Sequence, residues 1–207
     1  ISGGNEQQTY YLSYSNLTAD GIFPTDADSY NRNTISLRSS YTISDKFETS
    51  GSLNYINKKN SYVPTGQGEQ SVYNQIMQTP RDISLLELED IDNKWNNIDN
   101  FYSRYTVNPY FILKRNGNQN NEDRFFGSLN LEYHFTSYLN LNLRMGGDVS
   151  NENLEEWREI IKPGGNNEFA AISEPGMRGK SSRRRLELNA DLILNYQKQF
   201  GDYKENN

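Results

Sequence analysis

The 207-residue sequence contains no cysteine and only one histidine, and its mean hydropathy is low at −0.91. The absence of cysteine excludes disulfides, thiolate metal sites and cysteine nucleophiles, and it is compatible with an oxidising envelope compartment. There is no run of about eighteen apolar residues, which excludes a membrane-spanning helix. The net charge of −6 argues against a general nucleic-acid binder. Low hydropathy does not exclude a transmembrane barrel, because barrel strands expose only every second residue to lipid.

The sequence has instead a regular alternation of apolar and polar residues. Between Phe125 and Val149 apolar residues recur at every second position, and the alternation resumes in phase after Thr136–Tyr138. This period of two predicts β-strands with one apolar face. Similar strands are predicted on both sides of Ser44–Lys46 and over Leu186–Tyr196, where Ile193 interrupts the polar row. A further strand is predicted over Thr9–Thr18, with its orientation left open by tyrosines on both faces.

Short and long connections alternate between these strands. The short turns are Ser44–Lys46 and Thr136–Tyr138, whereas long polar segments cover Asp20–Asp28, Lys59–Asp123 and Asn151–Ser182. Transmembrane barrels have short turns at the periplasmic end and long loops outside the cell. A 65-residue loop would also be unusual inside a soluble domain. The pattern therefore favours a barrel, with an interfacial girdle formed by the aromatic residues beside the short turns. These aromatic residues are Tyr41, Phe47, Phe135, Tyr138, Tyr196 and Phe200.

The alternation also predicts which side chains face lipid and which face the barrel lumen. The residues expected to face lipid are Leu129, Leu131, Leu141, Leu143, Leu188 and Leu192. Those expected to face the lumen are Asn130, Glu132, Asn142, Arg144, Glu187 and Asp191.

Neither end of the sequence has the pattern of a natural terminus. Ile1–Gly4 lacks the basic and apolar regions of a signal peptide. Phe200–Tyr203 has the pattern of a short turn before another strand. Six strands also leave two open edges, and lipid tolerates no unpaired backbone edge. We therefore expect the chain to be a fragment of a larger barrel.

Several short strings occur in an order and spacing that point to one family. The strings are Ser2–Gly4, Tyr10–Tyr14, Asp20–Phe23, Gln78–Ile83, Asn108–Leu113 and the stretch Asp123–Asp148. Together they span nearly the whole chain, and the sequence resembles the barrel portion of SusC/RagA-type TonB-dependent outer-membrane transporters.

The resemblance implies an all-β fold, an antiparallel up-and-down barrel of 22 strands. Residues 1–207 would supply about six of these strands, without signal peptide, TonB box or plug domain. The implied function is import of oligomeric nutrients, glycans or peptides, across the bacterial outer membrane. The implied partners are a SusD-like surface lipoprotein, the TonB complex through the missing parts, and outer-membrane lipid. We expect gated passage, with no cofactor and no enzymatic activity in this segment.

Two groups of titratable residues invite a chemical role. His134 shares a face with Glu132, but a metal site would need further ligands, and a hydrated lumen accommodates both residues. The acidic run Glu87–Asp92 suggests calcium, yet a calcium loop of the EF-hand type would need glycine at Trp95 and Asp or Asn at Lys94. We interpret this run as a solvated loop helix or its cap.

The long loops carry the other candidate residues. Helical spacing over Ser71–Gln78, followed by Pro80, predicts a loop helix. Five aromatic residues of the largest loop are candidates for stacking on sugar rings, the alternative being loop packing. They are Tyr62, Trp95, Tyr102, Tyr105 and Tyr110. A basic cluster either contacts lipopolysaccharide phosphates or forms a solvated rim. It consists of Lys180, Arg183, Arg184 and Arg185.

Two other classes of protein remain as alternatives. A glycosidase needs two carboxylates at a defined separation, and no spacing in this acidic-rich sequence singles out such a pair. A soluble or surface carbohydrate-binding or adhesive β-sheet protein would need a second sheet to cover the apolar row.

Overall fold

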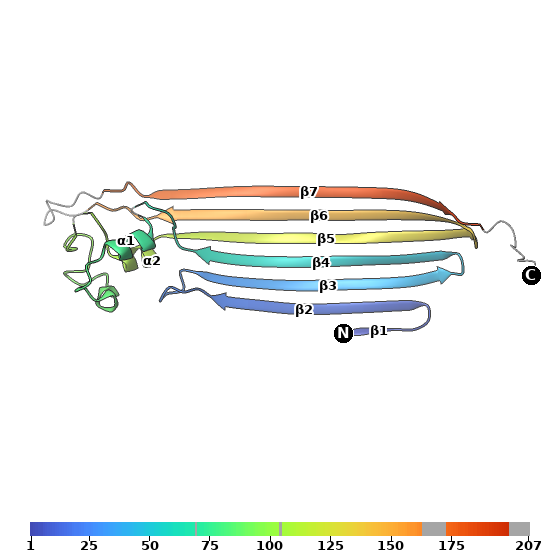
Figure 1. Cartoon of the computed structure of the whole chain (residues 1–207), viewed down its shortest axis with the longest axis horizontal. Coiled ribbons are helices and arrows are strands. Elements are labelled where there is room, and N and C mark those ends of the chain that lie inside the picture. Colours follow the sequence, from blue (N-terminus) through green and yellow to red (C-terminus); the bar gives the residue numbers. More distant parts are fainter. Residues whose placement is uncertain (69, 104, 163–172, 199–207) are drawn as a thin grey trace, which may run out of the picture.

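The computed structural model describes residues 1–68, 70–103, 105–162 and 173–198. Its main body is one antiparallel sheet in which every strand pairs with its neighbours in sequence (Figure 1). The strands are β1 (Ser2–Gly4), β2 (Gln8–Asp20), β3 (Ser29–Ser44), β4 (Phe47–Tyr62), β5 (Gly117–Thr136), β6 (Leu139–Arg158) and β7 (Met177–Tyr196). This up-and-down order confirms the predicted all-β antiparallel class. The described strands form an open sheet with β1 and β7 at its edges.

The six predicted strands are present, β1 is an additional short one, and the long strands extend further than the alternation indicated. The predicted loops Lys59–Asp123 and Asn151–Ser182 are therefore wrong at both ends. Ser61 pairs with Gln119, and Asn153 pairs with Ser182, inside those segments. The extensions are mostly polar, with only isolated apolar residues such as Ile56 and Leu154, so their sequences lack the apolar period that identifies a strand.

Three tight connections lie at one end of the sheet, opposite the helices (Figure 1). The β3–β4 and β5–β6 hairpins share one design, because each has a register irregularity just before its turn. In the first, the Ser44 hydroxyl accepts a hydrogen bond from the Lys46 amide at 3.4 Å. In the second, the Thr136 hydroxyl accepts one from the Tyr138 amide, also at 3.4 Å. Both turns lie where the sequence predicts them.

The connection between β4 and β5, residues 63–116, folds into a compact unit that we call the loop cap. It contains helix α1 (Val72–Gln78), a 3₁₀ helix (Leu85–Leu88) and helix α2 (Pro109–Arg115). Helix α1 confirms the predicted loop helix, with Ser71 as its N-cap, whereas α2 was not predicted. The acidic run is partly 3₁₀ helix, with Glu89 as the C-cap. None of the helices in the described part of the chain is long and apolar enough to cross a membrane.

The buried hydrophobic core of the described residues lies in the loop cap and its surroundings, not on the sheet. Its members are Val63, Val72, Leu88, Phe101, Val107, Tyr110, Phe111, Ile112, Leu113 and, from the β6–β7 connection, Ile161. The sheet contributes no side chain to this set. The apolar side chains of the sheet therefore lie outside this core.

Candidate functional site

The register of the sheet aligns the apolar residues of successive strands on a single face. Leu37 lies opposite Leu12 on β2 and Leu53 on β4. Leu143 lies opposite Leu131 on β5 and Leu192 on β7. Paired residues of an antiparallel sheet share a face, so these alignments build a continuous surface. We call this surface the apolar band. Its main members are Tyr10, Leu12, Tyr14, Ile35, Leu37, Tyr41, Phe47, Leu53, Tyr55, Phe125, Leu129, Leu131, Tyr133, Leu139, Leu141, Leu143, Met145, Val149, Leu186, Leu188, Leu192, Leu194 and Tyr196.

The apolar band has a uniform height along the longest strands. On β5 it runs from Phe125 to Phe135, on β6 from Leu139 to Val149, and on β7 from Leu186 to Tyr196, eleven residues each time. Ten steps of about 3.3 Å give roughly 33 Å along the strand. A tilt of about 40° reduces this to roughly 25 Å, the height of the apolar belt of outer-membrane barrels.

None of the side chains of the apolar band is buried, and many of them are exposed. Leu53, on a central strand, is 52% exposed, and Leu188, on the edge strand, is 76% exposed. No second layer within the described residues covers this face, because all the described strands belong to the one sheet. Exposed apolar patches larger than a few hundred Å² mark an interface with another protein or with a membrane.

Aromatic rings border the apolar band at both ends. At the turn end, Tyr133 lies 6.4 Å from Phe47 and 4.9 Å from Phe135, measured between ring centroids. Tyr138 and Tyr196 meet edge to face at 5.8 Å. These rings lie where the sequence predicted a girdle; Tyr41 lies one row further into the band, and Phe200 is outside the described residues.

The aromatic border at the loop end was not predicted. Tyr55 and Phe125 stack there with ring centroids 4.5 Å apart. The Tyr55 hydroxyl donates a hydrogen bond of 2.6 Å to Asp123, the first residue beyond the band on that face of β5. The sequence contains a signal for this border, because Tyr14 and Tyr55 stand last in their alternating runs and Phe125 stands first in its run.

The opposite face of the sheet is polar, and it carries the six residues predicted to share it. Arg124 donates from Nε to Asp148 at 2.9 Å and also forms an ion pair with it. Glu132 accepts a hydrogen bond from Asn140 at 3.1 Å and lies 3.4 Å from His134 Nε2. Among the described residues no group of three or more His, Cys, Asp or Glu is arranged to hold a metal ion. These contacts form a hydrogen-bonded polar lining.

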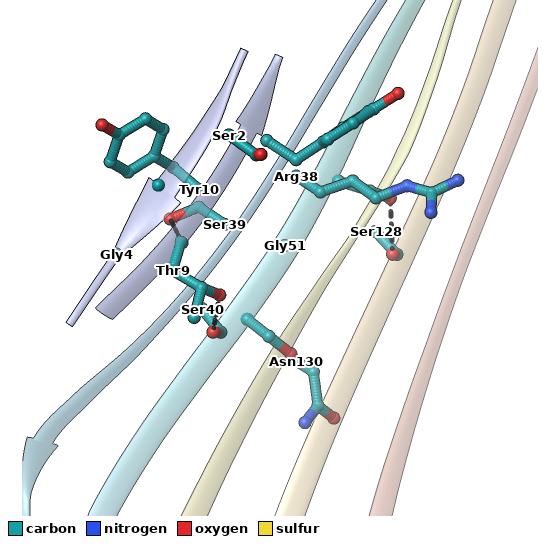
Figure 2. A pocket seen from close by; sticks show the side chains of 14 residues that line it. Ser2, Gly4, Thr9, Tyr10, Arg38, Ser39, Ser40, Gly51, Ser128 and Asn130 are labelled. Carbon is teal, nitrogen blue, oxygen red and sulfur yellow. Dashed lines mark hydrogen bonds between the residues drawn. The ribbon is translucent and has the colours of Figure 1, made fainter. Parts of the chain in front are cut away.

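An open depression of about 740 Å³ lies over the N-terminal half of the sheet. Small side chains form much of its floor, and the Ser52 and Ser128 hydroxyls lie 3.0 Å apart across β4 and β5. Figure 2 shows the Arg38 side chain extending over this floor toward Ser128. Within the described residues no acidic group pairs with Arg38. The depression offers hydroxyl groups and one cation to a ligand on this face. No motif in the sequence indicates that these residues lie together.

Four of the five aromatic candidates lie in the loop cap, whereas Tyr62 is the last residue of β4, and the five differ in exposure. Trp95 is 66% exposed, and the Lys94 ammonium lies 4.6 Å from its ring centroid. Tyr102 packs on Phe101 with centroids 4.4 Å apart, and Tyr62 and Tyr105 are also exposed. Tyr110 is only 5% exposed, because it stands in the first turn of α2 and packs into the cap core. Tyr110 is therefore a core residue and offers no stacking surface.

Two buried amide side chains hold the loop cap together. Gln75 on α1 accepts a hydrogen bond from the Val107 amide at 2.9 Å. Asn108 caps α2 by accepting from the Tyr110 amide at 2.9 Å, and its Nδ2 donates to the Leu88 carbonyl at 2.7 Å. These hydrogen bonds join segments that are far apart in sequence. They therefore hold the backbone that carries the exposed aromatic rings of the cap.

The predicted basic cluster is divided between the two faces of the sheet. Lys180 and Arg184 share the face of the apolar band, where Lys180 donates to Glu155 at 2.6 Å. That hydrogen bond lowers the pKa of Glu155, which lies well beyond the band. Arg183 is on the polar face, 3.9 Å from Glu152. The single cluster of the sequence analysis is therefore wrong, because β7 is a regular strand through these positions and its side chains alternate.

A scan against protein-family models finds no match for this chain, and a search of curated protein sequences finds none either. The functional interpretation therefore rests on the geometry of the sheet and the loop cap, together with the sequence resemblance.

Proposed function

We propose that the chain forms part of the wall of an outer-membrane β-barrel. In this proposal the apolar band faces lipid, the polar face lines the lumen, and the loop cap lies outside the cell. The observation that carries the proposal is the exposed apolar band, which is eleven residues high on β5, β6 and β7 and has aromatic rings at its turn end and, on β4 and β5, at its loop end. Lipid would cover such a surface without any second protein layer, and the band's height matches the outer-membrane hydrocarbon region.

We further propose that the barrel is a transporter of the SusC/RagA type, importing oligomeric glycans or peptides with a SusD-like surface lipoprotein. The sequence resemblance supports this class. The loop cap supports it as well, because a folded extracellular unit with exposed Trp95 and Tyr105 suits the capture of a large ligand or the docking of a partner. The reaction of this segment is binding and gated passage, with no bond made or broken.

Spin labels test the orientation of the sheet. In the complete protein containing this chain, labels at Leu129, Leu131 and Leu143 should be reached by oxygen dissolved in lipid. Labels at the neighbouring Asn130 and Asn142 should be reached by aqueous quenchers, because alternate residues of a strand point to opposite faces. Aqueous access at the leucines would contradict the membrane proposal and favour a soluble carbohydrate-binding or adhesive protein.

Epitope tags test the topology. A tag inserted between Gly66 and Gly68, where the loop cap is exposed and open, should be labelled on intact cells. A tag at Asp45, in the β3–β4 turn, should be labelled only after the outer membrane is permeabilised. Surface labelling at Asp45 alone would invert the proposed topology.

Removal of the loop cap tests the transporter function. Because Tyr62 pairs with Asn118, a short turn can join β4 to β5 in place of residues 63–116. This deletion should abolish uptake of one oligomeric nutrient or docking of its lipoprotein, while heat-modifiable gel mobility shows that the barrel still assembles. If the deletion variant grows normally on every nutrient whose uptake requires the protein, the cap has no role in transport. Hydrolysis of the ligand by the purified protein would instead support an enzyme.

A further inference from the structure

The strands continue far beyond the apolar band on the side of the loop cap. Ser150–Arg158 of β6 and Met177–Arg185 of β7 are paired residues past Val149 and Leu186, where the band ends on these strands. Nine residues at about 3.3 Å each extend this part of the sheet by roughly 30 Å along the strands. If the band faces lipid, this overhang lies in the polar layer above the outer leaflet.

The two rows directly beyond the band, on the band's own face, are rich in amide side chains. The first row contains Asn16, Asn33, Asn57, Asp123, Asn151 and Arg184. The second contains Thr18, Asn31, Lys59, Asn121, Asn153 and Ser182. We call these two rows the amide strip. It contains no apolar residue, whereas the opposite face at the same height includes Leu17 and Ile56.

Hydrogen bonds between neighbouring strands order the amide strip. Asn16 donates to Asn33 at 2.8 Å, and Asn31 donates to Thr18 at 2.9 Å. Asp123 accepts from Tyr55 at 2.6 Å and from Asn57 at 2.9 Å. The only carboxylate of the strip is thus engaged by two donors. Its two cations, Lys59 and Arg184, are exposed and form no ion pair within the described residues.

We propose that the amide strip binds the phosphorylated sugar headgroups of outer-leaflet glycolipids. This inference rests on the proposed membrane orientation, which would set the strip at headgroup level. Amide and hydroxyl groups both donate and accept, as sugar hydroxyls require. Lys59 and Arg184 supply the charge-assisted bonds that phosphate oxygens take. The ligand is a lipid that surrounds the barrel, distinct from any nutrient passing through the lumen.

The chain contains its own matched control for this proposal. Lys58 and Arg183 directly precede Lys59 and Arg184 in sequence, but they lie on the polar face, where they pair with Glu122 and Glu152. The double variants K59Q/R184Q and K58Q/R183Q therefore remove the same charges from opposite faces. Only the first double variant should affect a lipid that contacts the outer surface.

The test measures glycolipid retention by the complete protein in detergent and in nanodiscs. Native mass spectrometry counts bound molecules of lipopolysaccharide, of the same glycolipid without its phosphates, and of zwitterionic phospholipid. We expect K59Q/R184Q to weaken binding of the phosphorylated glycolipid by about tenfold, consistent with two cations near an anionic surface. K58Q/R183Q should bind as the wild type does. Inorganic phosphate at millimolar concentration should not displace the glycolipid, because the sugar contacts of the strip are not available to it.

Two results would overturn the proposal: equal weakening by both double variants, or unchanged retention in K59Q/R184Q. Heat-modifiable mobility and spin-label access of the same samples separate this failure from failure of the proposed function. If the barrel is assembled with its leucines in lipid and retention is unchanged, only the glycolipid inference is wrong. If the leucines are in water, the membrane proposal itself fails.

Discussion

The sheet and the loop cap of this chain differ in the exposure of their apolar side chains. In the cap, Ile112 and Val72 are completely buried in a small core, and amides such as Gln75 are buried with them because backbone groups satisfy their hydrogen bonds. In the sheet, leucines are exposed on one face and polar groups bond to each other on the other. The cap buries its apolar side chains in a core, whereas the sheet presents an apolar face and a polar face. In the proposed orientation, the cap lies in water, and the sheet has lipid on one face and water on the other.

The cap core gives the largest expected effect. Ile112→Ala removes a fully buried side chain, and such truncations cost about 2–5 kcal/mol. We expect cap amides to lose hydrogen-exchange protection and the cap to become sensitive to protease, while the barrel keeps its heat-modifiable mobility. Leu86→Ala, in the exposed part of the 3₁₀ helix, is the control and should change neither measurement. Simultaneous unfolding of the sheet would show that the two regions are one cooperative unit.

A charge in the apolar band gives the next effect and tests the other side of the comparison. Leu131→Arg should destabilise the proposed barrel in lipid vesicles by about 2–4 kcal/mol, because Leu131 lies near the middle of the band. Asn130→Arg, one residue away on the polar face, should cost much less. Urea unfolding from vesicles measures both. If both variants lower the free energy of unfolding equally, the two faces of the sheet are in contact with the same medium.

The buried Asn108 separates capping from cross-linking in the loop cap. Asn108→Ala should cost about 1–3 kcal/mol of cap stability, since it removes the α2 cap and leaves the Leu88 carbonyl without its donor. Asn108→Ser restores the capping oxygen alone. Cap hydrogen exchange in the two variants should therefore rank wild type, Ser, Ala. If hydrogen exchange of the cap is the same in Asn108→Ser as in the wild type, the hydrogen bonds donated by Asn108 Nδ2 contribute no stability to the cap.

The Glu155–Lys180 pair gives the smallest effect, since both groups are in contact with water. Lys180 lowers the folded-state pKa of Glu155, so the pair contributes stability above the unfolded-state pKa and loses it as pH falls through the folded-state value. Lys180→Gln should raise the pKa of Glu155 toward its ordinary range, as measured by carboxyl NMR titration, without a measurable change in barrel stability. Arg183→Gln, on the opposite face, should leave that pKa unchanged.

The sequence predicts the strands wherever one face is apolar, because period two then identifies both the strand and its orientation. Leu129 and Leu143 lie on the face assigned to them, and both short turns are in place. The sequence predicts loop rather than strand over the overhang, because Ser61 and Gln119 lie in mostly polar strand segments where no apolar period of two identifies a strand. Within the cap, helix α2 was signalled only by Asn108 and Pro109, a capping residue followed by proline at the first helical position. The burial of Tyr110 and the division of the basic cluster depend on local geometry, which the spacing of these residues in the sequence does not predict.

The pairing of Tyr62 with Asn118 also has a consequence for the order of assembly. The 54 residues between β4 and β5 form by far the longest connection in the sheet. Closing an unstructured loop of that length costs about 3–4 kcal/mol in its logarithmic term, far more than closing either two-residue hairpin turn. A cap that folds first around Ile112 and Asn108 brings the two ends together before the strands meet. Such a cap would align the β3–β4 hairpin with the β5–β6 hairpin, so that β4 can pair with β5.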